Sequence, residues 1–94
     1  MEKIIYEFGD YPNGTIAFCS SFETAKMELI DALKESIASY ENKLDKCEDA
    51  EYAQWLRDFI AGFEGEIERV EKATPVDSYH CYQFYITKDI VKED

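Results

Sequence analysis

Histidine, cysteine and clustered carboxylates are the side chains of this sequence whose types could support chemistry. His80 is the single histidine, so a histidine-based catalytic triad and a metal site with several histidine ligands are both excluded. Cys81 follows it directly, but consecutive residues of a strand point to opposite faces of a sheet. A dyad with Cys19 would need a basic group to lower the pKa of its thiol, and the sequence places none beside it. We therefore expect no nucleophilic catalysis.

Metal and cofactor sites also lack their motifs. The acidic run from Asp45 to Glu51 has neither the glycine nor the ligand spacing of a calcium-binding loop. Gly9 and Gly14 fall in a segment rich in turn-forming residues rather than in a glycine-rich phosphate loop. The sequence therefore predicts no metal, no cofactor and no enzyme.

The carboxylates repeat at helical spacing instead. Glu28, Asp31 and Glu35 are three and four residues apart, which places them on one face of a helix. Further acids follow in a similar rhythm, namely Glu41, Asp45, Glu48, Asp49, Glu51, Glu64, Glu68 and Glu71. Side chains at this spacing are ~5–6 Å apart at Cβ, similar to neighbouring phosphates of a nucleic acid. The stripes are interpreted as phosphate mimics for a basic groove; the alternative is a solvated surface that only keeps the protein soluble.

Aromatic residues near the connection between the two expected helices could anchor such a contact. Tyr52 and Trp55 are the first choice, because tyrosine and tryptophan contribute binding energy out of proportion to their number. The alternative is that the side of Trp55, Phe59 and Phe63 packs against a second copy of the chain. The predicted partner-binding residues are Glu28, Asp31, Glu35, Asp45, Glu48, Asp49, Tyr52, Trp55, Glu64 and Glu68.

The elements that must position these residues follow from hydrophobic periodicity. Alternation predicts strands over about residues 3–8 and 15–19, joined by a turn that contains proline and an Asn-Gly pair. Apolar residues three and four apart predict helices over about residues 22–46 and 50–72. A run of aromatic and β-branched residues predicts a third strand over about residues 79–87.

Helix ends are also recognisable. Ser20 and Ser21 offer caps for the first helix, with Glu23 placed as in a capping box. Asp49 is placed to cap the second helix. Pro75 ends the second helix, because the residue before a proline avoids helical angles.

The expected fold class is α+β with the order β-β-α-α-β. A three-stranded antiparallel sheet packs against a long helical hairpin, because neither layer can bury its apolar face alone. Residues 1–94 are expected to form a single domain. The charged tail from Lys88 to Asp94 is expected to fray.

Composition narrows the class of partner. The chain has 94 residues, of which 21 are acidic and 10 are lysine or arginine, a net charge of -11. This charge repels phosphate backbones and anionic membranes, so neither direct nucleic-acid binding nor membrane binding is expected. The N-terminal residues lack the apolar region of a signal peptide, and no stretch is long enough to span a membrane. Three cysteines without a common spacing indicate reduced thiols, and we expect a cytoplasmic protein.

Small size, acidity and the absence of catalytic motifs resemble small acidic phage-encoded anti-defence proteins, notably anti-CRISPR inhibitors. The resemblance covers the general character of the whole chain and involves no residue motif. It implies an inhibitor in the host-cell cytoplasm that occupies the basic nucleic-acid groove of an effector such as a CRISPR nuclease. The chain is similar in the same way to immunity proteins that neutralise basic nuclease toxins.

Two further functions stay open. The chain could be a structural module that assembles as a homodimer through its helical hairpin. It could also be a small-ligand sensor with a pocket lined by Tyr82, Phe84 and Phe63. Both are distinguished from an inhibitor by what occupies the aromatic residues: a second copy, a small molecule or a basic partner protein.

Overall fold

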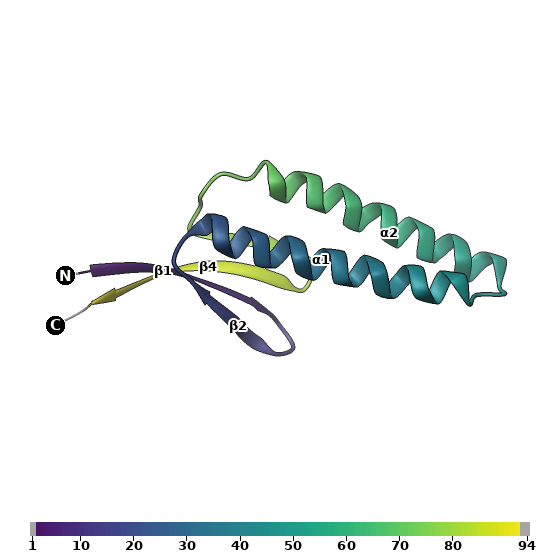
Figure 1. Ribbon diagram of the computed structural model, residues 1–94, viewed down its shortest axis with the longest axis horizontal. Helices are drawn as coiled ribbons and strands as arrows, with labels where there is room; N and C mark the ends of the chain where they lie inside the picture. Colours follow the sequence, from purple (N-terminus) through teal and green to yellow (C-terminus); the bar gives the residue numbers. More distant parts are fainter. Residues whose placement is uncertain (1, 93–94) are drawn as a thin grey trace. The chain divides into compact units, whose positions relative to one another are not determined.

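The computed structural model describes residues 2–92, and over these residues the fold is α+β, as expected (Figure 1). Its elements in chain order are β1 (Glu2–Asp10), β2 (Gly14–Cys19), α1 (Phe22–Asp45), α2 (Ala50–Glu71), β3 (Ser78–Cys81) and β4 (Phe84–Lys92). The chain divides into two compact units. The sheet unit contains residues 2–29 and 73–92 of the described chain, and the hairpin unit is Ile30–Lys72.

Four antiparallel strands of the described chain form one sheet in the order β2-β1-β4-β3. β1 and β4 lie side by side in its centre, paired from Glu2 opposite Lys92 to Asp10 opposite Phe84 (Figure 1). The expected three-stranded sheet is therefore wrong, and the observed order is β-β-α-α-β-β. The expected frayed tail is wrong for residues 88–92, which pair with residues 2–6 of β1. The last two residues of the chain lie outside the described region.

The core of the sheet unit combines one face of the sheet with the first turns of α1. Phe22 packs edge-on against Tyr6 with 5.8 Å between ring centroids, and Phe8 stacks on Phe84 at 5.9 Å. The buried apolar residues of this unit are Phe8, Cys19, Phe22, Ala25, Leu29, Cys81, Phe84 and Ile86. Burial of these rings and aliphatic chains is the main favourable contribution to the stability of the unit.

On β2, the pairing register determines which residues face the core. Ala17 lies opposite Phe8, and Cys19 lies opposite Tyr6. The alternate residues therefore point away from the core, and Phe18 is 70% exposed. β2 is also an edge strand without any charged residue.

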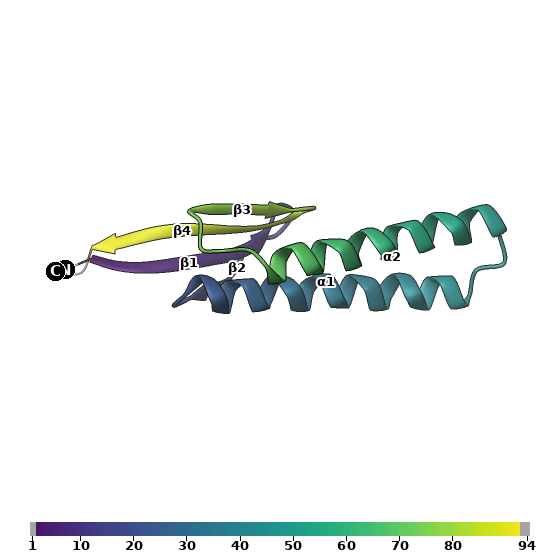
Figure 2. The ribbon, with the colours of Figure 1, turned by 90° about the horizontal axis from the view of Figure 1, so that it is seen from above.

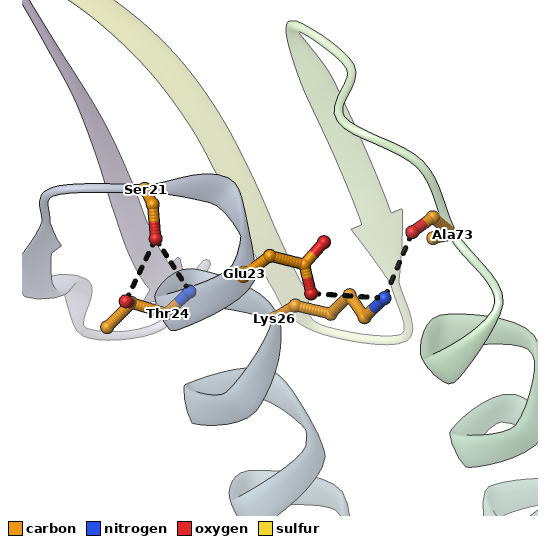
Figure 3. Close-up of polar contacts among 5 residues, drawn as sticks. All are labelled: Ser21, Glu23, Thr24, Lys26 and Ala73. Atoms are coloured by element: carbon orange, nitrogen blue, oxygen red, sulfur yellow. Dashed lines mark hydrogen bonds and ion pairs between the residues drawn. The ribbon is translucent and has the colours of Figure 1, made fainter.

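Ser21 caps the N-terminus of α1. Its Oγ accepts a hydrogen bond from the backbone N–H of Thr24 at 3.1 Å, so the cap lies one residue later than a capping box with Glu23 requires (Figure 3). Glu23 instead lies 3.6 Å from Nζ of Lys26. Lys26 also donates a hydrogen bond of 3.0 Å to the carbonyl of Ala73, and this bond joins the start of α1 to the segment that follows α2 (Figure 3).

The hairpin unit consists of α1 from Ile30 onward and of α2, which run antiparallel (Figure 2). Asp49 caps α2, as expected: its side chain accepts a hydrogen bond of 3.0 Å from the backbone N–H of Tyr52. α1 ends at residue 45 and α2 spans residues 50–71, within one residue of the ends expected from periodicity. The buried residues of the hairpin unit are Leu33, Ala53, Leu56, Phe63 and Val70.

The turn between β3 and β4 is not indicated by the sequence pattern. Tyr82 and Gln83 connect the two strands, and Tyr82 has a φ of 54°, in the left-handed region. Neither residue is a usual turn former, so the segment reads as one continuous strand. The turn is held from outside, because the backbone N–H of Tyr11 donates a hydrogen bond of 2.9 Å to the carbonyl of Gln83.

Comparing Tyr82→Ala with Tyr82→Gly tests this strained turn. Both variants remove the ring, but alanine keeps the steric cost of the left-handed conformation and glycine does not. We expect the glycine variant to be more stable by about 1 kcal/mol, after the greater entropy of glycine in the unfolded chain is allowed for. Urea unfolding followed by circular dichroism measures the difference. Equal stability of the two variants would show that residue 82 is not strained.

Candidate functional site

Five aromatic rings of the hairpin unit form a continuous group, here called the aromatic ladder: Tyr40, Tyr52, Trp55, Phe59 and Phe63. Tyr52 stacks on Trp55 at 5.6 Å between ring centroids, and Trp55 lies 4.4 Å from Phe59. Phe59 lies 5.5 Å from Tyr40 and 6.1 Å from Phe63. Phe63 is buried, whereas Tyr52 is 46% and Trp55 47% exposed. The aromatic ladder therefore runs from the interior to solvent and holds two half-exposed rings in place.

Two carboxylates flank the exposed end of the aromatic ladder. Glu51 and Asp58 are four residues before and three residues after Trp55, so all three share one face of α2. Both acids are exposed, and Asp58 accepts a hydrogen bond of 3.0 Å from Nε2 of Gln54. Neither Glu51 nor Asp58 is among the ten predicted partner-binding residues. Their spacing from Trp55 is the signal that identifies them.

All ten predicted partner-binding residues are exposed. Those that lie on α2, however, do not share one side of the helix. Glu64 follows Trp55 by nine residues, which is about 180° around the axis at 3.6 residues per turn, and Glu68 is about 140° away. Tyr52 and Trp55 therefore lie on one side of α2 near its N-terminus, where Asp49 is the N-cap. Glu64 and Glu68 lie on the other side.

On α1, Asp31, Glu35 and Asp45 lie within about 80° of one another around the helix axis. Glu28 precedes them on the same helix and belongs to the sheet unit, and Glu48 lies in the connection before α2. Salt bridges within residues 2–92 involve other acids, namely Glu23, Glu66 and Asp77. None of the predicted residues takes part in these salt bridges of the described chain.

His80 lies in a second group of residues, on the sheet. Its Nδ1 lies 2.5 Å from the Tyr11 hydroxyl, and its Nε2 lies 3.0 Å from Oγ of Ser78. A cleft of about 270 Å³ adjoins this chain of hydrogen bonds. We call it the sheet cleft; its lining residues are Asp10, Tyr11, Gly14, His80, Tyr85 and Thr87. No local sequence pattern indicates the contact between Tyr11 and Tyr85, because it depends on the pairing of β1 with β4.

A pair of carboxyl groups lies on the same sheet. A hydrogen bond with Asp89 is the main cause that raises the pKa of Glu7 above its ordinary value of 4.5, helped by partial burial. Oγ1 of Thr15 donates a hydrogen bond of 2.9 Å to Glu7 and acts in the opposite direction. The Thr15 hydroxyl also lies 3.4 Å from the hydroxyl of Tyr85, which connects the carboxyl pair with the sheet cleft.

The cysteines are free. Burial is the first cause that raises the pKa of the Cys19 thiol above its ordinary value of 9.0, and the negative charge of Glu28 is the second. This environment disfavours a nucleophilic thiolate at neutral pH. Over residues 2–92, no cluster of three or more histidine, cysteine or acidic side chains is arranged to hold a metal ion.

Neither helix of the described chain has the length and apolar character needed to cross a bilayer.

Glu7→Gln should stabilise the protein at neutral pH. The folded state holds a proton on Glu7 more tightly than the unfolded state, so this group contributes stability below about pH 4.5 that is lost as the pH rises through its folded pKa. Glutamine keeps hydrogen bonds to Asp89 and Thr15 without a second charge. We expect the variant to melt at a higher temperature than wild type at about pH 7, with a smaller difference at about pH 4.

Glu41→Gln is the matched control, because it removes the same charge from an exposed helical position. Thermal melts of the three proteins at both pH values separate the local effect from the general relief of net charge. An equal rise in melting temperature for the two variants at neutral pH would show that Glu7 and Asp89 do not interact as described.

Comparison with protein-family models, with curated proteins and with solved structures found no match. The geometry and charge described above are therefore what bears on the function of this chain. They define two candidate sites, one on the hairpin unit and one on the sheet unit.

Proposed function

We propose that this protein is an acidic protein–protein interaction domain that inhibits a nucleic-acid-binding effector, such as a CRISPR nuclease, by occupying its basic groove. The observation that carries the proposal is the stacked, half-exposed pair of Tyr52 and Trp55 beside Glu51 and Asp58, which are outside the salt bridges of residues 2–92. The hairpin unit has twelve acidic and six basic residues, a net charge of -6. This unit therefore combines aromatic anchors with a negative field.

The two kinds of side chain act at different stages of binding. Long-range attraction between opposite charges accelerates encounter with a basic groove. Slow dissociation comes from large rings that are already ordered, because little side-chain freedom is then lost on binding. Tyr52 and Trp55 meet this requirement through their stacking on each other and on Phe59. Asp31 and Glu35 are one turn apart on α1, so their Cβ atoms are ~5–6 Å apart. At this spacing their carboxylates could replace neighbouring phosphates.

The resemblance to acidic phage-encoded anti-defence proteins agrees with this mode of action and supports a cytoplasmic location. An immunity protein against a nuclease toxin would use the same physics on a different partner. In either case the partner is a basic protein, and neither nucleic acid nor a membrane is bound directly. The proposal includes no catalytic step.

Displacement from immobilised DNA tests the proposal. Proteins from a lysate of the native host are bound to DNA–cellulose and challenged with this protein at constant ionic strength. We expect it to release a basic nucleic-acid-binding protein that, once purified, binds it in a fixed stoichiometry and is competed by DNA. Polyglutamate at the same carboxylate concentration is the control. Equal release by polyglutamate, or no release, would contradict the proposal.

Variants of α2 separate contact from long-range attraction. Trp55→Ala should weaken binding by about 30-fold, the loss typical of an aromatic residue at the centre of an interface. The double variants Glu51→Gln/Asp58→Asn and Glu64→Gln/Glu68→Gln remove the same charge from opposite sides of α2. We expect the first pair to weaken binding more, because it flanks Trp55. Equal effects would mean that only the overall field matters and that Trp55 is not at the centre of the interface.

The rival function is homodimeric assembly through the exposed end of the aromatic ladder. The half-exposed Trp55 is the observation that favours it, since large exposed rings often mark interfaces. Light scattering with size-exclusion chromatography distinguishes the two functions. We expect a monomer at micromolar concentration, because association would bring two chains of charge -11 together. A dimer that Trp55→Ala converts to a monomer would establish assembly in place of the inhibitor.

A further inference from the structure

The sheet cleft lies on the face of the sheet that points away from the buried core. Tyr85 on β4 is paired with Gly9 of β1 and with His80 of β3. Residues directly opposite each other on neighbouring strands share a face, and so do residues two apart on one strand, such as Tyr85 and Thr87. Ile86, between them, is buried. The lining residues Tyr85, His80 and Thr87 therefore share the outer face of the sheet.

Asp10 also borders the cleft, but its side chain belongs to the opposite face. It is paired with Phe84, which is buried together with Phe8. Both of its carboxylate oxygens accept hydrogen bonds from Asn13, at 2.7 Å from the backbone N–H and at 3.2 Å from the side-chain amide. Lysine, arginine and glutamate are absent from the described residues that line the cleft. The cleft therefore suits a group without charge.

Tyr11 and His80 form a flat surface at the cleft. The Tyr11 hydroxyl lies 2.5 Å from Nδ1 of His80, and the two rings are within 3° of parallel, with 6.0 Å between their centroids. An imidazole nitrogen forms hydrogen bonds in the plane of its ring, so the rings lie edge to edge rather than face to face. Both are fixed, because His80 Nε2 lies 3.0 Å from Ser78 Oγ and the Tyr11 backbone N–H bonds to the Gln83 carbonyl. Tyr11 is nevertheless 61% exposed, so this flat surface is accessible to a ligand.

Tyr85 adds a second ring and a hydroxyl group to the cleft. Its ring lies 5.4 Å from that of Tyr11 and is tilted by 41°. It lies over Gly9, where an added Cβ would come within 2.6 Å of the Tyr85 hydroxyl, so the missing side chain makes room for the ring. Thr87 contributes another hydroxyl. The cleft therefore offers ring faces and hydroxyl donors, whereas the imidazole nitrogens of His80 are already engaged.

We propose that the sheet cleft binds a proline-rich segment of another protein in the polyproline II conformation. A proline ring is apolar and uncharged, and aromatic-lined grooves recognise such segments in several kinds of domain. Proline has no backbone N–H, so it needs no hydrogen-bond acceptor from the cleft, and its carbonyl accepts from a hydroxyl group. The segment is extended before it binds, which reduces the loss of conformational entropy.

Charge around the sheet cleft favours a basic neighbour for the proline. Glu7 is paired with Thr87, and Asp89 follows Thr87 by two residues, so both carboxyl groups lie on the outer face beside the cleft. A lysine or arginine next to the proline would lie near them. The net charge of -11 also disfavours nucleic-acid bases, which stack on tyrosine but bring phosphates. The inference goes beyond the function proposed for the hairpin unit and does not depend on it.

A titration with acetylated and amidated hexaproline tests the site, followed by proton–nitrogen correlation NMR. The control ligand is the corresponding hexamer of N-methylglycine, which keeps the tertiary amides but has no ring. We expect saturable shifts at Tyr11, Gly14, His80 and Tyr85 with hexaproline, and binding of the control weaker by about tenfold. Equal binding of the two hexamers, shifts that do not saturate, or shifts centred on the hairpin unit would each overturn the proposal.

Three variants locate the bound segment. Tyr11→Leu removes an exposed ring without opening the core and should weaken hexaproline binding by about threefold to tenfold. Thr87→Val removes a hydroxyl donor at nearly constant shape and should weaken binding by about fivefold. Tyr52→Leu is the matched control, because it removes a half-exposed ring of the hairpin unit and should leave binding unchanged. Unchanged affinity of the Tyr11 variant, or a loss caused by Tyr52→Leu, would overturn the assignment.

Two charged peptides test the expected basic neighbour. One is hexaproline followed by lysine and the other is hexaproline followed by glutamate, compared at the same ionic strength. We expect the lysine peptide to bind more tightly by about threefold or more, because its ammonium group is attracted by Glu7 and Asp89. Equal binding, or a preference for the glutamate peptide, would overturn the assignment of a basic neighbour.

Discussion

The antiparallel pairing of β1 with β4 is the interaction on which the sheet unit depends. It joins the first and last strands of the chain over the whole length of both, from Glu2 opposite Lys92 to Asp10 opposite Phe84. Each remaining strand is attached to one of these two. The same pairing brings Tyr11 and Tyr85 into contact and places Glu7 beside Asp89. The contact of Tyr11 with Tyr85 and the proximity of Glu7 to Asp89 are therefore both consequences of one long-range strand pairing.

In the hairpin unit, by contrast, most side-chain contacts among the aromatic rings are determined by local sequence spacing. Stacking of Tyr52, Trp55 and Phe59 follows from their three- and four-residue spacing on α2. Asp49 has two roles, since it caps α2 and also belongs to the negative surface. A carboxylate at a helix N-terminus interacts favourably with the helix dipole, so this one is stabilising whatever the partner.

Local patterns accounted for the two helices, the cap at Asp49 and the hairpin between β1 and β2, because each depends on residues near one another in sequence. They did not account for the turn at Tyr82, whose left-handed backbone is held by the distant Tyr11. For the site, residue type and position near the connection between the helices predicted Tyr52 and Trp55 as anchors, and both rings are half-exposed. The sequence prediction did not separate Glu64 from Trp55, although helical geometry places them on opposite sides of α2.

Composition and periodicity alone establish an acidic chain with an α+β fold, two consecutive long helices and aromatic residues near the connection between them. These properties are local or additive, so no knowledge of long-range contacts is needed to obtain them. The sheet cleft, the carboxyl pair of Glu7 and Asp89, and the nearly buried position of Asp10 belong to tertiary structure. Their members are far apart in sequence and meet only because β1 pairs with β4. A pattern with a period of two or 3.6 residues carries no information about such pairings.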